Sequence, residues 1–160
     1  MEIDNKKLVY RKMDENDLDI FVKLRLDFLY EMNQELTENN RDKIIDSLKK
    51  YYVKYLIKNE FIGIICEYNG NIISTAYLAI NEKPANFNFV NGKIGTLLNV
   101  YTYPEYRKKG ISTNIVKIIM EEAKKENVFE IELIATEDGE KIYRSLGYKE
   151  SEMKYMNIKL

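Results

Sequence analysis

The chain has 160 residues, of which 45% are hydrophobic and 32% charged, so it is long enough and apolar enough to fold as one domain over residues 1–160. Its 25 Lys and Arg residues balance 26 Asp and Glu residues, which excludes a general electrostatic attraction to nucleic acid or to an anionic membrane. A single Cys66 and the absence of histidine exclude an internal disulfide and the usual zinc-ligand clusters, so no metal is expected.

The first part of the chain predicts one strand and two helices. Leu8–Arg11 is typical of a short strand, and the acidic residues at 14–17 are suited to cap a helix that runs from Leu18 to Met32. Arg25 interrupts the apolar stripe of this helix, which fits either a cleft lined by this face or an arginine whose stem is buried and whose head reaches solvent. Apolar residues at three- and four-residue steps predict a second helix over Ile44–Leu56.

Two β-rich runs follow, at Phe61–Tyr68 and Ile72–Ile80. Asn69-Gly70-Asn71 separates them, and Asn-Gly is a strong signal for a tight hairpin, so the two strands should pair antiparallel. Glu82–Gly92 contains a proline and several asparagines, which predicts an irregular loop whose tip lies near a substrate.

The second half of the chain alternates strands and helices. We expect a strand at Lys93–Tyr103, a helix at Gly110–Asn127, a strand at Glu130–Ala135, a helix at Asp138–Leu146 and a terminal strand at Tyr148–Leu160. A strand, helix, strand order forms a parallel pair. The fold class is therefore α/β, with a mixed sheet that is antiparallel at its start.

A basic turn joins the strand that ends near Pro104 to the next helix. Arg107, Lys108 and Lys109 flank Gly110, which opens the helix and lets the backbone approach a ligand without a side chain in the way. Unpaired N–H groups and the positive end of the helix dipole favour a phosphate or pyrophosphate there. A solvated helix cap is the other interpretation of the turn taken alone.

Two motifs resemble those of the GNAT superfamily of N-acetyltransferases. Arg107-Lys-Lys-Gly110-Ile-Ser112 is similar to the coenzyme A signature Arg/Gln-x-x-Gly-x-Gly/Ala, although Ser112 stands where the family usually has Gly or Ala. Asp138 to Tyr148 is similar to the family's helix that ends in Tyr-x-x-Leu-Gly-Phe/Tyr. The resemblance implies a GNAT fold, with a mostly antiparallel sheet of six or seven strands, a splayed parallel pair and about four helices.

The resemblance also implies acetyl-coenzyme A as cosubstrate, with its pantetheine amides paired to the splayed and often bulged strand. It implies that Tyr143 lies beside the coenzyme sulfur, where a phenol can protonate the leaving thiolate. We name no general base: Glu31, Glu67 and Glu137 are candidates that could act through water, but a surface role explains each of them better. The predicted cofactor-binding residues are Asn99, Val100, Tyr101, Thr102, Arg107, Lys108, Lys109, Gly110, Ile111, Ser112 and Thr113.

The expected activity is direct transfer of an acetyl group to a primary amine of a small molecule or peptide. The acceptor cleft should lie between the first two helices and the loop, with walls from Phe28, Tyr30, Phe87 and Phe89. The alternatives are a non-catalytic acyl-coenzyme A sensor with the same fold, and an interaction domain without a small ligand. With no signal peptide pattern and no apolar run of about 20 residues, we expect a cytoplasmic protein; relatives of this kind suggest a homodimer.

Overall fold

A computed structural model describes residues 3–32, 38–87, 89–152 and 154–160. Position 88 of the predicted loop and position 153 of the predicted terminal strand lie outside the described residues. In chain order the helices and strands are β1 (Leu8–Lys12), α1 (Leu18–Glu31), α2 (Glu38–Ile57), β2 (Phe61–Tyr68), β3 (Asn71–Glu82), β4 (Lys93–Thr102), α3 (Ile111–Lys125), β5 (Glu130–Glu132) and α4 (Glu137–Ser145).

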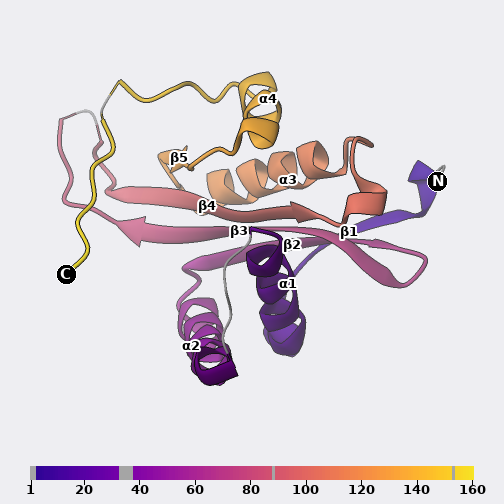
Figure 1. Ribbon diagram of the computed structural model, residues 1–160. Helices are drawn as coiled ribbons and strands as arrows, with labels where there is room; N and C mark the ends of the chain where they lie inside the picture. The colour runs from indigo at the N-terminus through magenta and orange to yellow at the C-terminus, as the bar shows by residue number, and fades with distance from the viewer. Residues whose placement is uncertain (1–2, 33–37, 88, 153) are drawn as a thin grey trace.

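One mixed sheet runs through the centre of the molecule, with strand order β1-β2-β3-β4-β5. The first four strands pair antiparallel, and β4 pairs parallel with β5. The predicted hairpin is confirmed: Asn69 (φ 50°) and Gly70 (φ 78°) both adopt the left-handed backbone conformation that a tight turn with the right twist requires. In Figure 1, α1 and α2 cover one face of the sheet, and α3 and α4 lie over the other.

The two faces of the sheet carry two separate hydrophobic clusters. Alternate residues of β2 divide between them, since Ile64 packs toward α3 and Ile65 toward α1. Both faces are covered, which is why β2 and β3 are almost continuously apolar. The α3 cluster includes Ile62, Leu78, Ile115 and Ile119, and the α1 cluster includes Phe21, Leu24, Tyr52, Phe61 and Tyr77.

The sheet has five strands among the described residues, so the expected six or seven is corrected. The predicted strand over Tyr148–Leu160 is wrong: residues 148–152 and 154–160 belong to no strand, and Tyr155 and Ile158 are exposed. Alternating apolar residues only favour a strand; they do not supply the neighbouring edge that holds one. β5 is three residues long instead of six, so the edge it offers is short.

A charge network fastens the start of α1 to the edge of the sheet. Asp17, only 3% exposed, accepts hydrogen bonds from Nη1 and Nη2 of Arg11 at 2.7 and 2.8 Å and from the Asp14 amide at 2.9 Å. Arg11 also donates through Nε to Glu67 of β2 at 2.8 Å. These hydrogen bonds, chiefly those from Arg11, lower the pKa of the Asp17 carboxyl.

Arg11→Gln should lower the free energy of unfolding by about 2 kcal/mol at pH 7, because it leaves the buried Asp17 carboxylate without its cation. The loss is smaller than for a fully buried pair, since the Arg11 side chain is 36% exposed. A carboxyl whose pKa is depressed on folding contributes stability above its unfolded value, near 3.9, and loses it as the pH falls through the folded value. Urea unfolding at pH 7 and pH 3 should show the deficit shrinking at the lower pH.

The matched control for this experiment is Lys12→Gln, which removes a more exposed pair with Glu122 at 3.7 Å and should change stability by less than about 0.5 kcal/mol. An Arg11→Gln deficit of equal size at both pH values would show that lost packing, rather than the unpaired carboxylate, is responsible.

Among the described residues, no helix has the length and apolar character to cross a membrane. Nor do those residues contain a group of three or more Asp, Glu or Cys side chains placed to hold a metal ion.

Candidate active site

The C-terminal half of β4 contains a β-bulge. Tyr77 of β3 pairs with Leu98, but Thr75 pairs with Tyr101, so β4 has one extra residue between these pairs. Asn99 has a left-handed φ of 52° at this point, a conformation that asparagine tolerates better than most residues. The extra residue re-aims the side chains that follow: Tyr101 meets Phe28 of α1, with ring centroids 6.2 Å apart, and Val100 packs against the α3 cluster.

Pairing of β4 with its parallel neighbour ends at Thr96, before the bulge. β5 pairs with β4 only over Ile94–Thr96, and among the described residues no strand pairs with this edge of β4 from Leu97 to Thr102. The expected bulge and splay are both present. The backbone N–H and C=O groups on this edge are available to an extended ligand, which can add to the sheet as a further strand would.

The turn after β4 connects the end of this open strand edge to the N-terminus of α3. Gly110 is the N-cap residue, with φ 76° and no side-chain cap, so the first N–H groups of α3 are left for a ligand or solvent. A Cβ built on Gly110 would meet no atom within 4 Å, which shows open space in front of the helix. The positive end of the helix dipole and this space fit a phosphate group.

The basic side chains of the turn have partners of their own. Arg107 donates through Nε to the Thr102 carbonyl at 2.7 Å and through Nη2 to Glu31 of α1 at 2.5 Å. Lys109 donates to the carbonyl of Glu105 at 2.9 Å, while Lys108 is exposed and has a left-handed φ of 59°. Arg107 therefore holds the turn against both β4 and α1.

Ser112, the departure from the GNAT signature, belongs to a chain of hydroxyl groups. Its Oγ lies 2.8 Å from Oγ1 of Thr102, which lies 2.6 Å from Oγ of Ser74. Ser74 also donates to the carbonyl of Tyr101 at 2.8 Å. The serine thus joins the first turn of α3 to the end of β4, and its small side chain is accommodated there.

Tyr143 lies on α4 on the same face of the sheet as Val100, since both border the α3 cluster. Gly147, with φ 93°, ends the helix, and the Tyr148 amide donates back to the Tyr143 carbonyl at 3.1 Å. The two tyrosine rings meet edge to face at 5.7 Å. Burial raises the pKa of Tyr143, so its phenol keeps its proton at neutral pH.

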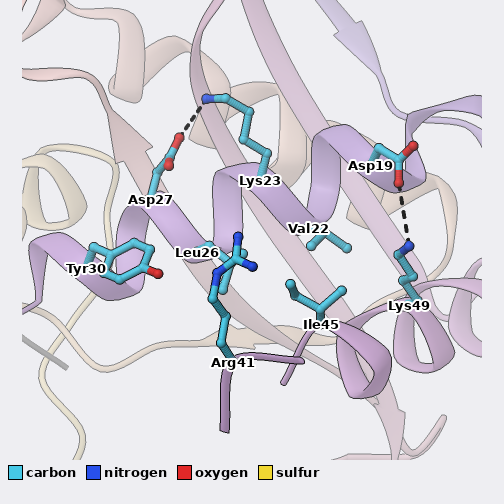
Figure 2. Close-up of a pocket in the computed structure, with 9 residues that line it drawn as sticks. All are labelled: Asp19, Val22, Lys23, Leu26, Asp27, Tyr30, Arg41, Ile45 and Lys49. Atoms are coloured by element: carbon cyan, nitrogen blue, oxygen red, sulfur yellow. Dashed lines mark hydrogen bonds and ion pairs between the residues drawn. The ribbon is translucent and has the colours of Figure 1, made fainter. Parts of the chain in front are cut away.

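Two of the four predicted acceptor residues lie on α1. Phe28 contacts Tyr101 at the bulge, and Tyr30 lines a cavity of about 320 Å³ between α1 and α2. Figure 2 shows this cavity, with Lys23–Asp27 and Lys49–Asp19 ion pairs at its rim. The full lining is Asp19, Val22, Lys23, Leu26, Asp27, Tyr30, Arg41, Ile45 and Lys49.

The structure does not bring Phe87 and Phe89 together with Phe28 and Tyr30. The loop between β3 and β4 leaves the sheet at the pair Glu82–Lys93, the opposite end of β4 from the bulge. Phe87 is fully exposed, and Phe89 is buried against Phe129, with ring centroids 5.0 Å apart.

No sequence pattern predicts the polar contacts between α1 and the end of β4. Tyr103, just after β4, donates to Asp27 at 2.5 Å, and Lys23 donates to both Asp27 and the Tyr103 hydroxyl at 2.7 Å. The spacing of Lys23 and Asp27 predicts an ion pair on the helix surface, but Tyr103 is distant in the sequence. Arg25 donates to Asn99 at 3.1 Å in the same interface.

Of the three carboxylates considered as a base, two are engaged elsewhere. Glu31 pairs with Arg107, and Glu67 pairs with Arg11 on the far side of β3. Glu137 is exposed in the first turn of α4.

Comparisons with known proteins agree with this geometry. A predicted acetyltransferase from Clostridium acetobutylicum, crystallised with acetyl-CoA, is 28% identical, with 95% of this chain and 96% of that chain covered and a TM-score of 0.84. A GCN5-related N-acetyltransferase from Ralstonia eutropha JMP134 shares the fold at 20% identity, with coverage of 94% and 98% and a TM-score of 0.80. So does glucosamine-6-phosphate N-acetyltransferase from Arabidopsis thaliana, at 18% identity, coverage of 94% and 97%, and a TM-score of 0.70.

No curated protein sequence matches the chain. The model of the acetyltransferase (GNAT) family matches residues 26–148, a range that includes the end of α1, the bulged strand, the basic turn and Tyr143. The chain therefore belongs to the GNAT acetyltransferase family.

Proposed function

We propose that this acyltransferase, folded as one domain over residues 1–160, moves an acetyl group from acetyl-CoA to a primary amine of a small molecule or peptide. The observation that carries the proposal is the continuity of the open β4 edge, from Leu97 to Thr102, with the uncapped N-terminus of α3 at Gly110. An extended amide chain that ends in a pyrophosphate matches both features in this order.

The backbone of β4 would hold the pantetheine amides, and the N–H groups of Ile111, Ser112 and Thr113 would hold the pyrophosphate. The left-handed Gly110 keeps side-chain atoms away from the phosphate oxygens. Arg107 would act mainly by bracing the turn, because its guanidinium is bound to Thr102 and Glu31.

In the reaction, the amine nitrogen forms a bond to the thioester carbonyl carbon, and the C–S bond breaks with its electron pair on sulfur. Tyr143 donates its proton to that sulfur as charge develops, and the Val100 N–H polarises the carbonyl oxygen. The proton that the nitrogen loses as the amide forms returns through water to the Tyr143 phenolate. The amine must first lose a proton, at about 1.4 kcal/mol per pK unit. With Glu31 and Glu67 held in ion pairs, we assign that proton to solvent water rather than to a named base.

Calorimetric titration with acetyl-CoA, followed by a thiol-release assay over amines, amino acids and short peptides, tests this function. Saturable binding and amine-dependent thiol release are expected. Binding without release for every acceptor would favour the non-catalytic sensor, which the engagement of Glu31 and Glu67 in ion pairs also fits. Absence of binding to folded protein would overturn the proposal.

Ser112→Ala should lower the free energy of unfolding by about 1 kcal/mol, because Thr102 loses a hydrogen-bond partner between α3 and β4. Acetyl-CoA affinity should change by less than about threefold, since the site uses backbone N–H groups. Thermal unfolding and calorimetry measure the two effects. A loss of affinity of tenfold or more would mean that the serine hydroxyl itself binds phosphate.

A further inference from the structure

Arg25 occupies an unusual place for an arginine. It lies on the sheet-facing side of α1, between Leu24 and Leu26, which are 2% and 7% exposed. Its Nη1 donates to Oδ1 of Asn99 at 3.1 Å, and its guanidinium carbon lies 5.5 Å from the centre of the Phe28 ring. The side chain therefore reaches inward to the bulge of β4, instead of extending along the helix surface.

This half-buried cation has no acidic partner. Arg11 and Arg107 each form an ion pair, whereas no carboxylate of the described residues pairs with Arg25. Burial lowers its pKa, and the only described groups that oppose this effect are the phenols of Tyr77 and Tyr51, which are neutral at pH 7. A guanidinium still remains cationic at neutral pH. An uncompensated charge in a partly desolvated place is costly, which is typical of a site for an anionic ligand.

Two buried polar groups beside Arg25 also lack partners among the described residues. They are Nδ2 of Asn99 and the hydroxyl of Tyr77, in residues that are 4% and 2% exposed; the side chain of Thr75 lies near this hydroxyl without a hydrogen bond of good geometry. Tyr77 pairs with Leu98 in the sheet, directly before the bulge. Oδ1 of Asn99 accepts from Arg25, and Nδ2 of the same amide remains a free donor. Each of the three groups can donate a hydrogen bond to an oxygen of a bound ligand.

We propose that Arg25, with Asn99 and Tyr77, binds a carboxylate of the acceptor. The proposal rests on the proposed function. Asn99 directly precedes Val100, whose N–H is assigned to the thioester carbonyl, so the anionic group lies close to the reacting amine. The acceptor is thus a compact molecule that carries a primary amine and a carboxylate a few bonds apart, as an amino acid does.

The test uses acceptors in pairs that differ only in the carboxylate: L-phenylalanine and 2-phenylethylamine, L-lysine and cadaverine, glycine and methylamine. Each is titrated by calorimetry into protein saturated with coenzyme A, so no turnover is needed. Glucosamine 6-phosphate and glucosamine form a fourth pair, for a phosphate in place of the carboxylate. We expect at least one amino acid to bind about tenfold or more tightly than its decarboxylated partner.

Arg25→Gln should remove this preference, weakening the amino acid about 10- to 100-fold and leaving the neutral amine within threefold. Arg25→Lys keeps the charge without the planar fork and should recover part of the preference. Lys124→Gln is the matched control: it removes a surface cation near the C-terminal end of α3 that pairs with Glu121, and should leave every ratio unchanged.

Equal affinities within all amino-acid pairs would overturn the proposal, and this comparison needs only the unmodified protein. A preference that persists in a folded Arg25→Gln variant would also overturn it. If glucosamine 6-phosphate binds more tightly than glucosamine while the amino-acid pairs show equal affinities, Arg25 binds a phosphate and the carboxylate proposal is overturned. Failure of coenzyme A itself to bind is a separate result, since it contradicts the proposed function on which this inference rests.

Discussion

Gly110→Asp is expected to weaken acetyl-CoA binding about 100-fold, which corresponds to about 2.7 kcal/mol. The new carboxylate would stand at the N-terminus of α3, where the pyrophosphate is proposed to lie, and would repel it while occupying the same N–H groups. The fold should survive, because a Cβ at this position meets no atom within 4 Å. Calorimetry gives the affinity, and thermal unfolding shows whether the variant is folded.

Gly110→Asn is the matched control, because it adds a side chain of nearly the same size without the charge. Asn and Asp both tolerate the left-handed conformation, here φ 76°, better than most residues. The neutral variant should lose less than about tenfold in affinity for acetyl-CoA, because its side-chain amide obstructs the site but does not repel the pyrophosphate. Equal losses in both variants would attribute the effect to bulk, and full affinity in Gly110→Asp would place the pyrophosphate elsewhere.

Tyr143→Phe should reduce kcat about 100-fold, within the range typical for loss of a general acid. The coenzyme thiol has an ordinary pKa near 8.5, so the departing sulfur gains from a proton donor that is still protonated at neutral pH. Burial raises the pKa of the Tyr143 phenol and so keeps that proton in place. The Kd for acetyl-CoA should stay within threefold, because the ring remains and only its hydroxyl is removed.

Tyr148→Phe separates catalysis from packing in this pair of rings. Tyr148 touches Tyr143 edge to face, but its hydroxyl is buried and has no partner among the described residues. Burial raises its pKa to about 12, the same direction as for Tyr143, so the two variants test the position of the hydroxyl and not the direction of its pKa shift. Its removal should leave kcat unchanged and stability equal or higher by up to about 1 kcal/mol. Equal losses of kcat in both variants would mean that the pair acts through packing, and the general-acid role of Tyr143 would be abandoned.

The sequence predicted best those features that depend on neighbouring residues. Asn69-Gly70 specifies a tight hairpin by its own backbone preferences, and Gly110 marks the start of α3 in the same way. Alternation in 148–160 was a weaker guide, because a strand needs a partner as well as a pattern. Phe87 and Phe89 were predicted near the acceptor from composition alone, and nothing in the loop's sequence shows which end of β4 it lies beside.

Contacts between distant parts of the chain were beyond prediction. Asn99 is 74 residues from Arg25, and Tyr103 is 76 residues from Asp27. The sequence shows that Arg25 interrupts the apolar stripe of α1. It does not show that Arg25 contacts Asn99, because that contact requires the bulge in β4. Register and bulges arise from the pairing of whole strands, and no single window of sequence contains them.

The extra residue in β4 makes the enzyme sensitive to a change in strand length. Deleting Asn99 would leave Leu98 opposite Tyr77 and Tyr101 opposite Thr75, so the side chains beyond the bulge would keep their faces of the sheet. The bulge itself would be lost, together with the Asn99 side chain that contacts Arg25 of α1. A one-residue deletion in the exposed loop at residues 84–87 leaves the bulge intact. Active variants should therefore tolerate deletions in this loop and not at positions 98–101.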